Sequence, residues 1–405
     1  IKFDISVLGS SGGPLEINCC SYLIKTSNIS YTSILSQNLI NHFICIDAGS
    51  GYASFNKMIS NENEFLFKNT SVNTNTNTNT DTNTDTNTTT TNKIIGKIHS
   101  NNLILNSYND SLNFLDYTNC SLSTLNLNCT QLKLNPSQIT SKLFDLIESY
   151  FITHPHLDHI LALIINSAGF NQNSSNNYLS KKIYGSNFTI NALKTHIFNG
   201  IIWPDLSKYD KLLQFIEIND EKNLNINLNS IFNIKPFSLN HGVVSDGSLN
   251  HQIYKSNCFF IQNNFNLNSI LIFGDFEANS IKNGKIWDHA SLLIYKNQLS
   301  GIIIECSTEN LPDGVPLYGH MTPNNLFNEF ISLNEKLQNL HKKNNTKITH
   351  QNSLNGLNIL ITHVKESYTQ FDPRKKILNQ LNNLNDKYQF GLKFTIIFPG
   401  VTYSI

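Results

Sequence analysis

The chain has 405 residues, enough for one large domain or two ordinary ones with an ample apolar core. Its 29 basic and 29 acidic residues give a net charge of zero, and 14% of the residues are charged, so the composition argues against a surface that binds nucleic acid or another polyanion. No run is apolar and long enough for a transmembrane helix, so we expect no membrane partner.

The cysteines and the first residues of the chain indicate a cytoplasmic protein. Seven cysteines are scattered without a C-x-x-C pair, which argues against a thiolate zinc knuckle. An odd number of cysteines without a secretory leader is typical of reduced thiols. The segment IKFDISVLG at 1–9 alternates like a strand and has no signal-peptide profile.

Short β-rich runs alternate with helical patterns along the chain. The β-rich runs are FDISVL, CSYLIK, HFICID, SYFIT, KIYG, IFNIKPFSL, CFFIQ, ILIFG, GIIIE, LNILIT and KFTIIF. The helical patterns lie near 137–150, 157–168, 187–199, 323–341 and 374–386. About eleven strands with fewer helices favour two sheets with helices outside them, an α/β fold of the layered α+β kind, over one doubly wound sheet.

Residues 70–92, TSVNTNTNTNTDTNTDTNTTTTN, contain a single apolar residue, Val72. Such a tract cannot bury enough surface to offset the entropy that ordering removes, so we expect it to be disordered. We interpret the tract as part of a poorly ordered insertion around 54–135, in a surface loop of a single domain that spans 1–405.

The segment FITHPHLDHI, at 151–160, places three histidines and an aspartate on a predicted strand-to-helix turn. The proline between the first two histidines excludes helix at His154. His154 and His156 therefore lie two apart on extended backbone, where both side chains can point the same way. Asp158 and His159 follow where the helix begins. Two nitrogen ligands beside an oxygen–nitrogen pair suit two metal ions a few ångströms apart.

Further candidate ligands stand at the ends of three later strands. His241 follows IKPFSLN, Asp275 follows ILIFG, and His363 follows LNILIT. If these three ends converge in a sheet sandwich, they complete a site for two metal ions. We expect Asp275 to bridge both ions, because a carboxylate has two oxygens to share.

These motifs resemble the metallo-β-lactamase fold and, within it, the class II cyclic-nucleotide phosphodiesterases, the fungal low-affinity cyclic AMP enzymes. HPHLDH fits the HxHxDH motif of the fold, and THPHLDHI is similar to the form in this family. Further matches, in the family's order, are VLGSSGGP, IDAGSG, FNGIIWPDL, NHGV, FGDFE, IIIECS, YGHMTP and ITHVK. The resemblance covers the chain except about 54–140, and it implies a metallo-β-lactamase-like αββα sandwich of two mixed β-sheets with outer helices.

The resemblance implies metal-dependent hydrolysis of 3′,5′-cyclic nucleotides, cyclic AMP and also cyclic GMP, to nucleoside 5′-monophosphates, which lowers cyclic AMP signalling. It implies two divalent ions, with Zn²⁺ as the first choice and Mg²⁺ or Mn²⁺ as alternatives. The implied ligands are His154, His156 and His241 for one ion, Asp158, His159 and His363 for the other, and Asp275 for both. His320 falls where related phosphodiesterases carry a histidine that is not a ligand but lies near the scissile phosphate.

Two divalent ions can lower the pKa of a shared water and hold the phosphate oxygens during in-line displacement. The leaving 3′ oxygen then needs a proton, and we expect His320 to supply it. The alternatives for His320 are a metal ligand or a substrate clamp. Glu305, fifteen residues earlier, is expected to orient the His320 imidazole, or else to be an ordinary strand-end carboxylate. Asp158 is counted among the catalytic residues as well as among the ligands.

Three other features near the motifs have two interpretations each. The segment LGSSGGP, at 8–14, lacks the G-x-G-x-x-G spacing of a phosphate-binding loop, so a tight turn beside the metal site is expected. Asp47 is expected to accept hydrogen bonds from its loop or from the histidine motif, or else to be a solvated turn residue. Trp203 is expected either to stack on the nucleotide or to pack against a helix.

Two other functions are alternatives. One is another hydrolase of the same fold, chiefly a tRNA 3′ processing nuclease, which needs clustered basic residues. The tight basic clusters here are only 181–182, 342–343 and 374–376. The other is a non-catalytic scaffold, but degenerate members lose ligands and this chain has all seven. The expected partner is a small cyclic nucleotide, and a homodimer is an open alternative.

Overall fold

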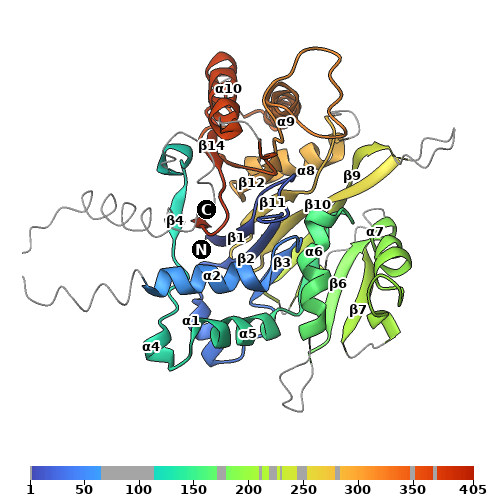
Figure 1. Ribbon diagram of the computed structural model, residues 1–405. Coiled ribbons are helices and arrows are strands. Elements are labelled where there is room, and N and C mark those ends of the chain that lie inside the picture. Colours follow the sequence, from blue (N-terminus) through green and yellow to red (C-terminus); the bar gives the residue numbers. More distant parts are fainter. Residues whose placement is uncertain are drawn as a thin grey trace, which may run out of the picture.

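The computed structural model describes residues 2–64, 114–170, 179–208, 212–218, 226–228, 230–243, 253–278, 283–346, 352–367 and 372–405. Within these ranges the chain forms two mixed β-sheets that pack face to face, with helices on both outer sides (Figure 1). The predicted layered fold of two mixed sheets with outer helices is therefore confirmed.

The first sheet comprises β1 (Phe3–Gly9), β2 (Ser21–Thr26), β3 (Phe43–Ile46), β4 (Ser121–Ser123), β5 (Ser149–Phe151), β6 (Lys181–Ser186), β7 (Leu213–Ile218) and β15 (Thr402–Ser404). Its strand order is β4-β15-β1-β2-β3-β5-β6-β7. The strands from β4 to β3 pair antiparallel, whereas β3, β5, β6 and β7 run parallel. The carboxyl ends of β3 and β5 therefore meet at the same edge of the sheet.

The second sheet comprises β8 (Ile226–Leu228), β9 (Phe232–Val243), β10 (Ile253–Asn263), β11 (Ser269–Phe273), β12 (Leu299–Glu305), β13 (Asn358–Thr362) and β14 (Lys393–Ile396). Its order is β14-β13-β12-β11-β10-β9-β8. The strands from β8 to β11 are antiparallel, and those from β11 to β14 are parallel. The chain segments that follow β11, β12 and β13 consequently leave the sheet side by side.

The helices are α1 (Tyr31–Ser36), α2 (Tyr52–Asn63), α4 (Cys129–Leu132), α5 (Pro136–Leu146), α6 (Leu157–Asn166), α7 (Asn187–Ala192), α8 (Gly284–Tyr295), α9 (Pro323–Lys343) and α10 (Pro373–Tyr388). Shorter turns are the 3₁₀ helices η3 (Phe114–Tyr117), η4 (Ser167–Gly169) and η6 (Leu206–Lys208), and the π-helix η5 (Leu193–Ile197). In Figure 1, α9 and α10 lie at the top and α1, α2 and α5 at the bottom.

Side chains of alternating direction along a strand separate two apolar clusters. In β5, Phe151 packs into the cluster between the sheets, whereas Tyr150 and the following Ile152 pack with the helices outside the first sheet. The inner cluster extends through the second sheet to residues of α8, α9 and α10. Because both faces of the central strands are buried, their ends are held rigidly, and these ends carry the polar residues discussed below.

Two boundaries predicted from the sequence are wrong. The helix predicted at 137–150 ends at Leu146, because the chain turns there and enters β5. The insertion predicted at 54–135 is too wide at both ends, since α2 runs to Asn63 and η3, β4 and α4 follow residue 113. The Thr/Asn tract at 70–92 lies outside the described residues.

The two ends of the insertion are joined by hydrogen bonds. The carboxylate of Glu62 accepts from the backbone nitrogens of Leu125, at 2.9 Å, and of Asn126, at 2.6 Å. Asn63 Oδ1 accepts from the backbone nitrogen of Cys129 at 2.8 Å. The end of α2 and the segment 125–129 are therefore fixed to each other by these hydrogen bonds.

No disulfide joins any of the seven cysteines, all of which lie in described ranges. Within those ranges, no helix combines the length and the apolar character that a membrane crossing requires.

Candidate metal centre and active site

The histidine motif lies on the turn between β5 and α6, as the sequence predicts. His156 is the N-cap of α6 with extended backbone angles (φ −66°, ψ 148°), and Asp158 and His159 lie in the first turn of the helix. The strand is extended up to this point because the preceding proline disfavours helix at His154. The turn therefore displays two histidines from extended chain and two further groups from the start of the helix.

A first cluster gathers nitrogens from three histidines around one aspartate. His156 Nδ1 lies 3.1 Å from His154 Nε2 and 3.3 Å from His241 Nε2. Asp275 Oδ2 lies 3.7 Å from His154 Nε2 and 3.8 Å from His241 Nε2. These four residues offer ligand atoms that all lie within 4.8 Å of one another.

A second cluster shares the same aspartate. His363 Nε2 lies 2.9 Å from Asp275 Oδ2 and 3.1 Å from Asp158 Oδ2. His159 Nε2 lies 3.4 Å from Asp275 Oδ1 and 3.7 Å from Asp158 Oδ2. The structure therefore brings together all seven residues expected as ligands, with Asp275 common to the two clusters.

Hydrogen bonds on the outer side of the clusters fix which ring nitrogen faces inward. Asp47 Oδ2 accepts from Thr153 Oγ1 at 2.9 Å and from His159 Nδ1 at 2.8 Å, and a carboxylate can only accept. The Thr153 hydroxyl gives its proton to Asp47, so at 3.0 Å it accepts from His154 Nδ1. Both imidazoles thus donate through Nδ1, so Nε2 is the ring nitrogen that faces the cluster.

The same arrangement holds His241 and His363. His241 Nδ1 donates to the carbonyl of Gly319 at 3.0 Å. The Ser307 hydroxyl donates to Glu305 Oε2 at 2.7 Å, and it therefore accepts from His363 Nδ1 at 3.0 Å. Four of the five histidines expected as ligands consequently turn Nε2, and not Nδ1, towards the clusters.

This donor set fits a divalent cation. Nitrogens of neutral imidazoles together with aspartate oxygens are the usual ligands of zinc and related ions. His159 Nε2 is buried and makes no hydrogen bond, although carboxylates surround it. A buried polar atom without a partner is costly, and a cation at this point satisfies it. The clusters are therefore divalent-metal sites by their chemistry.

The pKa values of the histidines differ between the two clusters. Burial, with the charge on His159, lowers the pKa of His154 well below its usual range. Burial and the neighbouring imidazole of His241 lower the pKa of His156 to about 4. Burial opposes the charge on His159 and His363, yet the aspartates, Asp275 first, outweigh it and raise the pKa of each well above its usual range. A positive charge is thus favoured on the side of the second cluster.

Beside the clusters, Glu305 and His320 contact each other. His320 Nδ1 lies 3.1 Å from Glu305 Oε2, and the carboxylate also accepts from the backbone nitrogens of Phe276, at 2.7 Å, and Met321, at 3.3 Å. Burial raises the pKa of the Glu305 carboxyl, but His320 outweighs it and lowers that pKa. Glu305 therefore joins the loops that carry Asp275 and His320 into one polar network. His320, His241, Asp275 and Glu305 also offer atoms that could bind a metal and that all lie within 4.8 Å of one another. The interpretation of His320 as a metal ligand therefore stays open.

Close backbone approach at two glycines is needed to form the site. A Cβ on Gly12, in the LGSSGGP turn, would lie 2.3 Å from the Cε1 and Nδ1 atoms of His363. Gly319 has a φ of +83°, and a Cβ there would lie 2.9 Å from His241 Nδ1. The turn beside the metal site therefore packs directly on a ligand ring, and the glycine makes this packing possible.

The sequence interpretation of Trp203 as a nucleotide-stacking residue is not supported. Its indole nitrogen donates to Ser167 Oγ at 2.9 Å, and its ring packs on the apolar cluster outside the first sheet. The sequence analysis also missed Thr153, Ser307 and Tyr254. Thr153 and Ser307 could have been found as hydroxyl residues within the motifs THPH and ECS. Tyr254 lies four residues before the β-rich run CFFIQ, and nothing in the sequence around it indicated a role.

Two mixed sheets with outer helices, and a cluster of inward-facing histidine nitrogens around a shared aspartate, define a metal-dependent hydrolase. The chain belongs to the class II cAMP phosphodiesterases. The pattern of that family, described as "cAMP phosphodiesterases class-II", matches residues 59–400. The family resemblance of the sequence motifs is confirmed.

Two curated relatives match over essentially their whole length. A 3′,5′-cyclic-nucleotide phosphodiesterase of Candida albicans is 30% identical over 473 residues, which cover 100% of both chains. The 3′,5′-cyclic-nucleotide phosphodiesterase 1 of Saccharomyces cerevisiae is 27% identical over 415 residues and 99% of both chains. The crystal structure of unliganded yeast PDE1 superposes with a TM-score of 0.73 at 24% identity, covering 100% of both chains, and this likeness shows that the fold is shared.

Proposed function

We propose that the protein hydrolyses 3′,5′-cyclic nucleotides, cyclic AMP and also cyclic GMP, to nucleoside 5′-monophosphates with the help of two divalent ions. The observation that carries the proposal is Asp275, whose two oxygens reach both clusters of ligand atoms. The relatives from Candida albicans and Saccharomyces cerevisiae, both named as cyclic-nucleotide phosphodiesterases, support the same reaction. Zn²⁺ is the first choice of ion because imidazole nitrogens dominate the donor set.

His154, His156 and His241 would hold one ion, and Asp158, His159 and His363 the other, with Asp275 between them. When bound, such ions polarise the phosphodiester oxygens and make a nucleophile available from water near neutral pH. The residues of the chain fix the geometry, because each ligand imidazole except His156 is held from behind by a hydrogen bond to Nδ1.

His320 would donate the proton that the leaving 3′ oxygen needs. Its Nδ1 faces Glu305, which can only accept, so this nitrogen carries one proton. The proton for the leaving oxygen would then come from Nε2 of the doubly protonated ring, which becomes neutral on the transfer. Glu305 would act as the positioning residue, since it holds the imidazole and the loop of Met321 together. A positioned acid of this kind typically contributes about 10²–10⁴-fold to the rate.

The test uses purified, metal-loaded protein with each cyclic nucleotide, with and without a chelator, and separates the products by chromatography. We expect nucleoside 5′-monophosphate as the product and no turnover after chelation. Release of a 3′-monophosphate would contradict the role given to His320, because the 5′ oxygen would then be the leaving group. Absence of turnover at full metal loading would refute the proposed function, and absence of stoichiometric metal would favour the scaffold alternative.

A further inference from the structure

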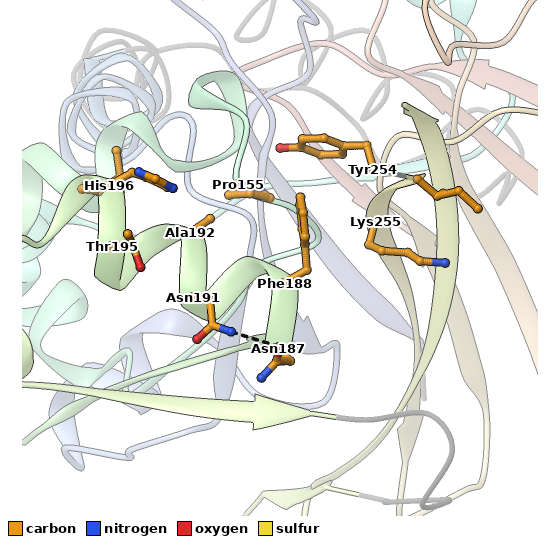
Figure 2. A pocket seen from close by; sticks show the side chains of 11 residues that line it. Pro155, Asn187, Phe188, Asn191, Ala192, Thr195, His196, Tyr254 and Lys255 are labelled. Carbon is orange, nitrogen blue, oxygen red and sulfur yellow. Dashed lines mark hydrogen bonds between the residues drawn. The ribbon is translucent and has the colours of Figure 1, made fainter. Parts of the chain in front are cut away.

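A cavity of about 940 Å³ opens beside Pro155, the residue between His154 and His156. Figure 2 shows the side chains that line this cavity. Pro155, Phe188, Ala192, Thr195, Tyr254 and Lys255 are among the residues that line it. They come from the β5–α6 turn, from α7 with the π-helix η5, and from the start of β10. Its size falls within the range of about 300–1,000 Å³ that small-molecule sites have.

The cavity lies next to the first histidine cluster. Pro155 lies between two ligand histidines in the sequence and forms part of the cavity wall. The ring of Tyr254 covers the ring of His156, with centroids 4.4 Å apart and planes inclined by 33°. Its centroid also lies 5.7 Å from that of His241. A molecule whose phosphate contacts the clusters therefore extends naturally along Tyr254 into the cavity.

Two aromatic rings form a corner in this cavity. Phe188 and Tyr254 have centroids 4.8 Å apart and planes at 75°, so the edge of one ring meets the face of the other (Figure 2). A planar base placed in such a corner stacks on one ring and meets the edge of the other, and both arrangements are favourable for aromatic groups. Stacking of this kind accepts any base, because every base has a π-face.

The cavity wall carries little charge that could compete with the two clusters for the phosphate. Lys255 carries the single fixed charge among the lining residues, and its amine donates to Asn240 Oδ1 at 3.0 Å. The rest of the lining is apolar or neutral apart from His196. The anionic part of a substrate is therefore drawn to the metal clusters, and the neutral, planar part suits the cavity.

The backbone that lines the cavity is unusual. Residues Leu193–Ile197 form a π-helix directly after α7, and Thr195, His196 and Ile197 of this turn border the cavity. π-helical turns are rare and occur frequently at functional sites, because the extra residue re-aims the neighbouring side chains. This is an observation independent of the aromatic corner, and it marks the same cavity.

We propose that this cavity binds the nucleobase of the substrate, with Phe188 and Tyr254 as its stacking surface. The proposal rests on the proposed function, since the phosphate of the same molecule is assigned to the metal clusters. Phe188 is the more informative residue, because its ring contact among the described residues is with Tyr254, whereas Tyr254 itself also contacts the rings of His154, His156 and His241.

The test compares two ligands that differ only by a base. Adenosine 5′-monophosphate and ribose 5-phosphate are titrated by calorimetry into the metal-loaded protein. We expect the nucleotide to bind about 5- to 150-fold more tightly, the fold-change that corresponds to stacking of one base. In Phe188→Ala this ratio should fall towards one, while the affinity for ribose 5-phosphate and the metal content stay unchanged.

Phe265→Ala is the matched control, since this residue is 64% exposed in the turn between β10 and β11. It should keep the full ratio. If Phe188→Ala does not fold, Phe188→Leu keeps the bulk without the ring and should still lower the ratio. A ratio that stays unchanged in the folded Phe188 variants, or that is already one in the unmodified protein, overturns the proposal. The proposed function fails separately, by absence of cyclic-nucleotide turnover.

Discussion

Gly12 lies against the imidazole of His363 so closely that a methyl group does not fit between them. A Cβ at this position would lie 2.3 Å from two ring atoms, far inside van der Waals contact. The Nδ1 atom of the same ring donates to Ser307 Oγ, so a shift of the ring away from residue 12 would disturb this hydrogen bond. The first turn of the chain and a ligand more than 350 residues later thus form one packed unit.

Gly12→Ala should therefore displace His363 and weaken metal binding, by about 10- to 100-fold as for other residues that orient a ligand. Metal content after dialysis, together with turnover, measures the effect. Gly284→Ala is the control, because the nearest atom to a Cβ there is the flexible Lys336 amine at 3.9 Å. Equal metal retention in both variants would contradict the packing argument.

Asp275→Ala should lose both ions and the activity with them. The carboxylate is buried, and its oxygens lie between 2.9 and 3.8 Å from four histidine nitrogens of the two clusters. Elemental analysis of the purified variant measures the loss. Asp288→Ala, on the exposed surface of α8, should keep both ions. Retention of one full equivalent by Asp275→Ala would show that the aspartate serves a single ion.

His320→Ala should keep both ions and lose about 10²–10⁴-fold in turnover, because general acid catalysis is removed while the ligands stay in place. The paired measurements are metal content and the rate with cyclic AMP. His341→Ala, near the end of α9, should change neither quantity. Loss of one ion from His320→Ala would instead place this residue among the ligands.

Lys181→Met should destabilise the fold by about 2–3 kcal/mol, because buried carbonyls lose their donor. The buried amine of Lys181 donates to three carbonyl oxygens at the end of α5, of Phe144 at 2.8 Å, Asp145 at 2.9 Å and Ile147 at 2.6 Å. A positive charge at this C-terminal end also interacts favourably with the dipole of helix α5. Denaturant unfolding measures the difference.

The neighbouring residue provides the control for this change. Lys182 pairs with Glu148 at 2.8 Å, and its side chain is one-third exposed. Partly exposed ion pairs contribute about 1 kcal/mol or less, so Lys182→Met should cost little. Equal losses of unfolding free energy in the two variants would show that the three carbonyls find other partners.

Replacement of the Thr/Asn tract at 70–92 by a short Gly/Ser linker should leave metal content and turnover nearly unchanged. Glu62 and Asn63 hold the base of the insertion closed, so the linker starts from a fixed point. Stability should change little, because loop-closure entropy varies slowly with length, by about 0.6 kcal/mol for each doubling. A large fall in turnover with unchanged unfolding free energy would show that the tract contributes to the active site.

The sequence predicts the site well where the signal is local. His154, His156, Asp158 and His159 lie within six positions, and the proline sets the backbone between them. Asp275 and His363 could be found because each follows a buried strand of the parallel part of the second sheet, and parallel strands end at one edge. His241, which was expected after a strand, lies within the last residues of the antiparallel strand β9. The assignment of these three residues to one ion or the other depends on distances across two sheets, which no spacing in the sequence contains.

Other parts of the fold and the site gave no adequate signal. The helix α2 was assigned to the insertion because asparagine and serine conceal the apolar side of a helix, although Phe55 and Ile59 are fully buried. Tyr254 owes its place beside His156 to the pairing of β9 with β10, a tertiary contact. The role of Ser307 depends on a carboxylate and an imidazole that reach it from separate strands.

The position of β15 has a consequence for the kinetics of folding. This strand lies between β1 and β4, and Ser6 Oγ is 3.1 Å from Thr402 Oγ1, a separation of 396 residues along the chain. Contacts of such high sequence separation form slowly, because the intervening chain must be closed into a loop first. During synthesis, β1 keeps an unpaired edge until residues 402–404 have followed it, so the first sheet depends on protection from aggregation while the almost 400 intervening residues are made.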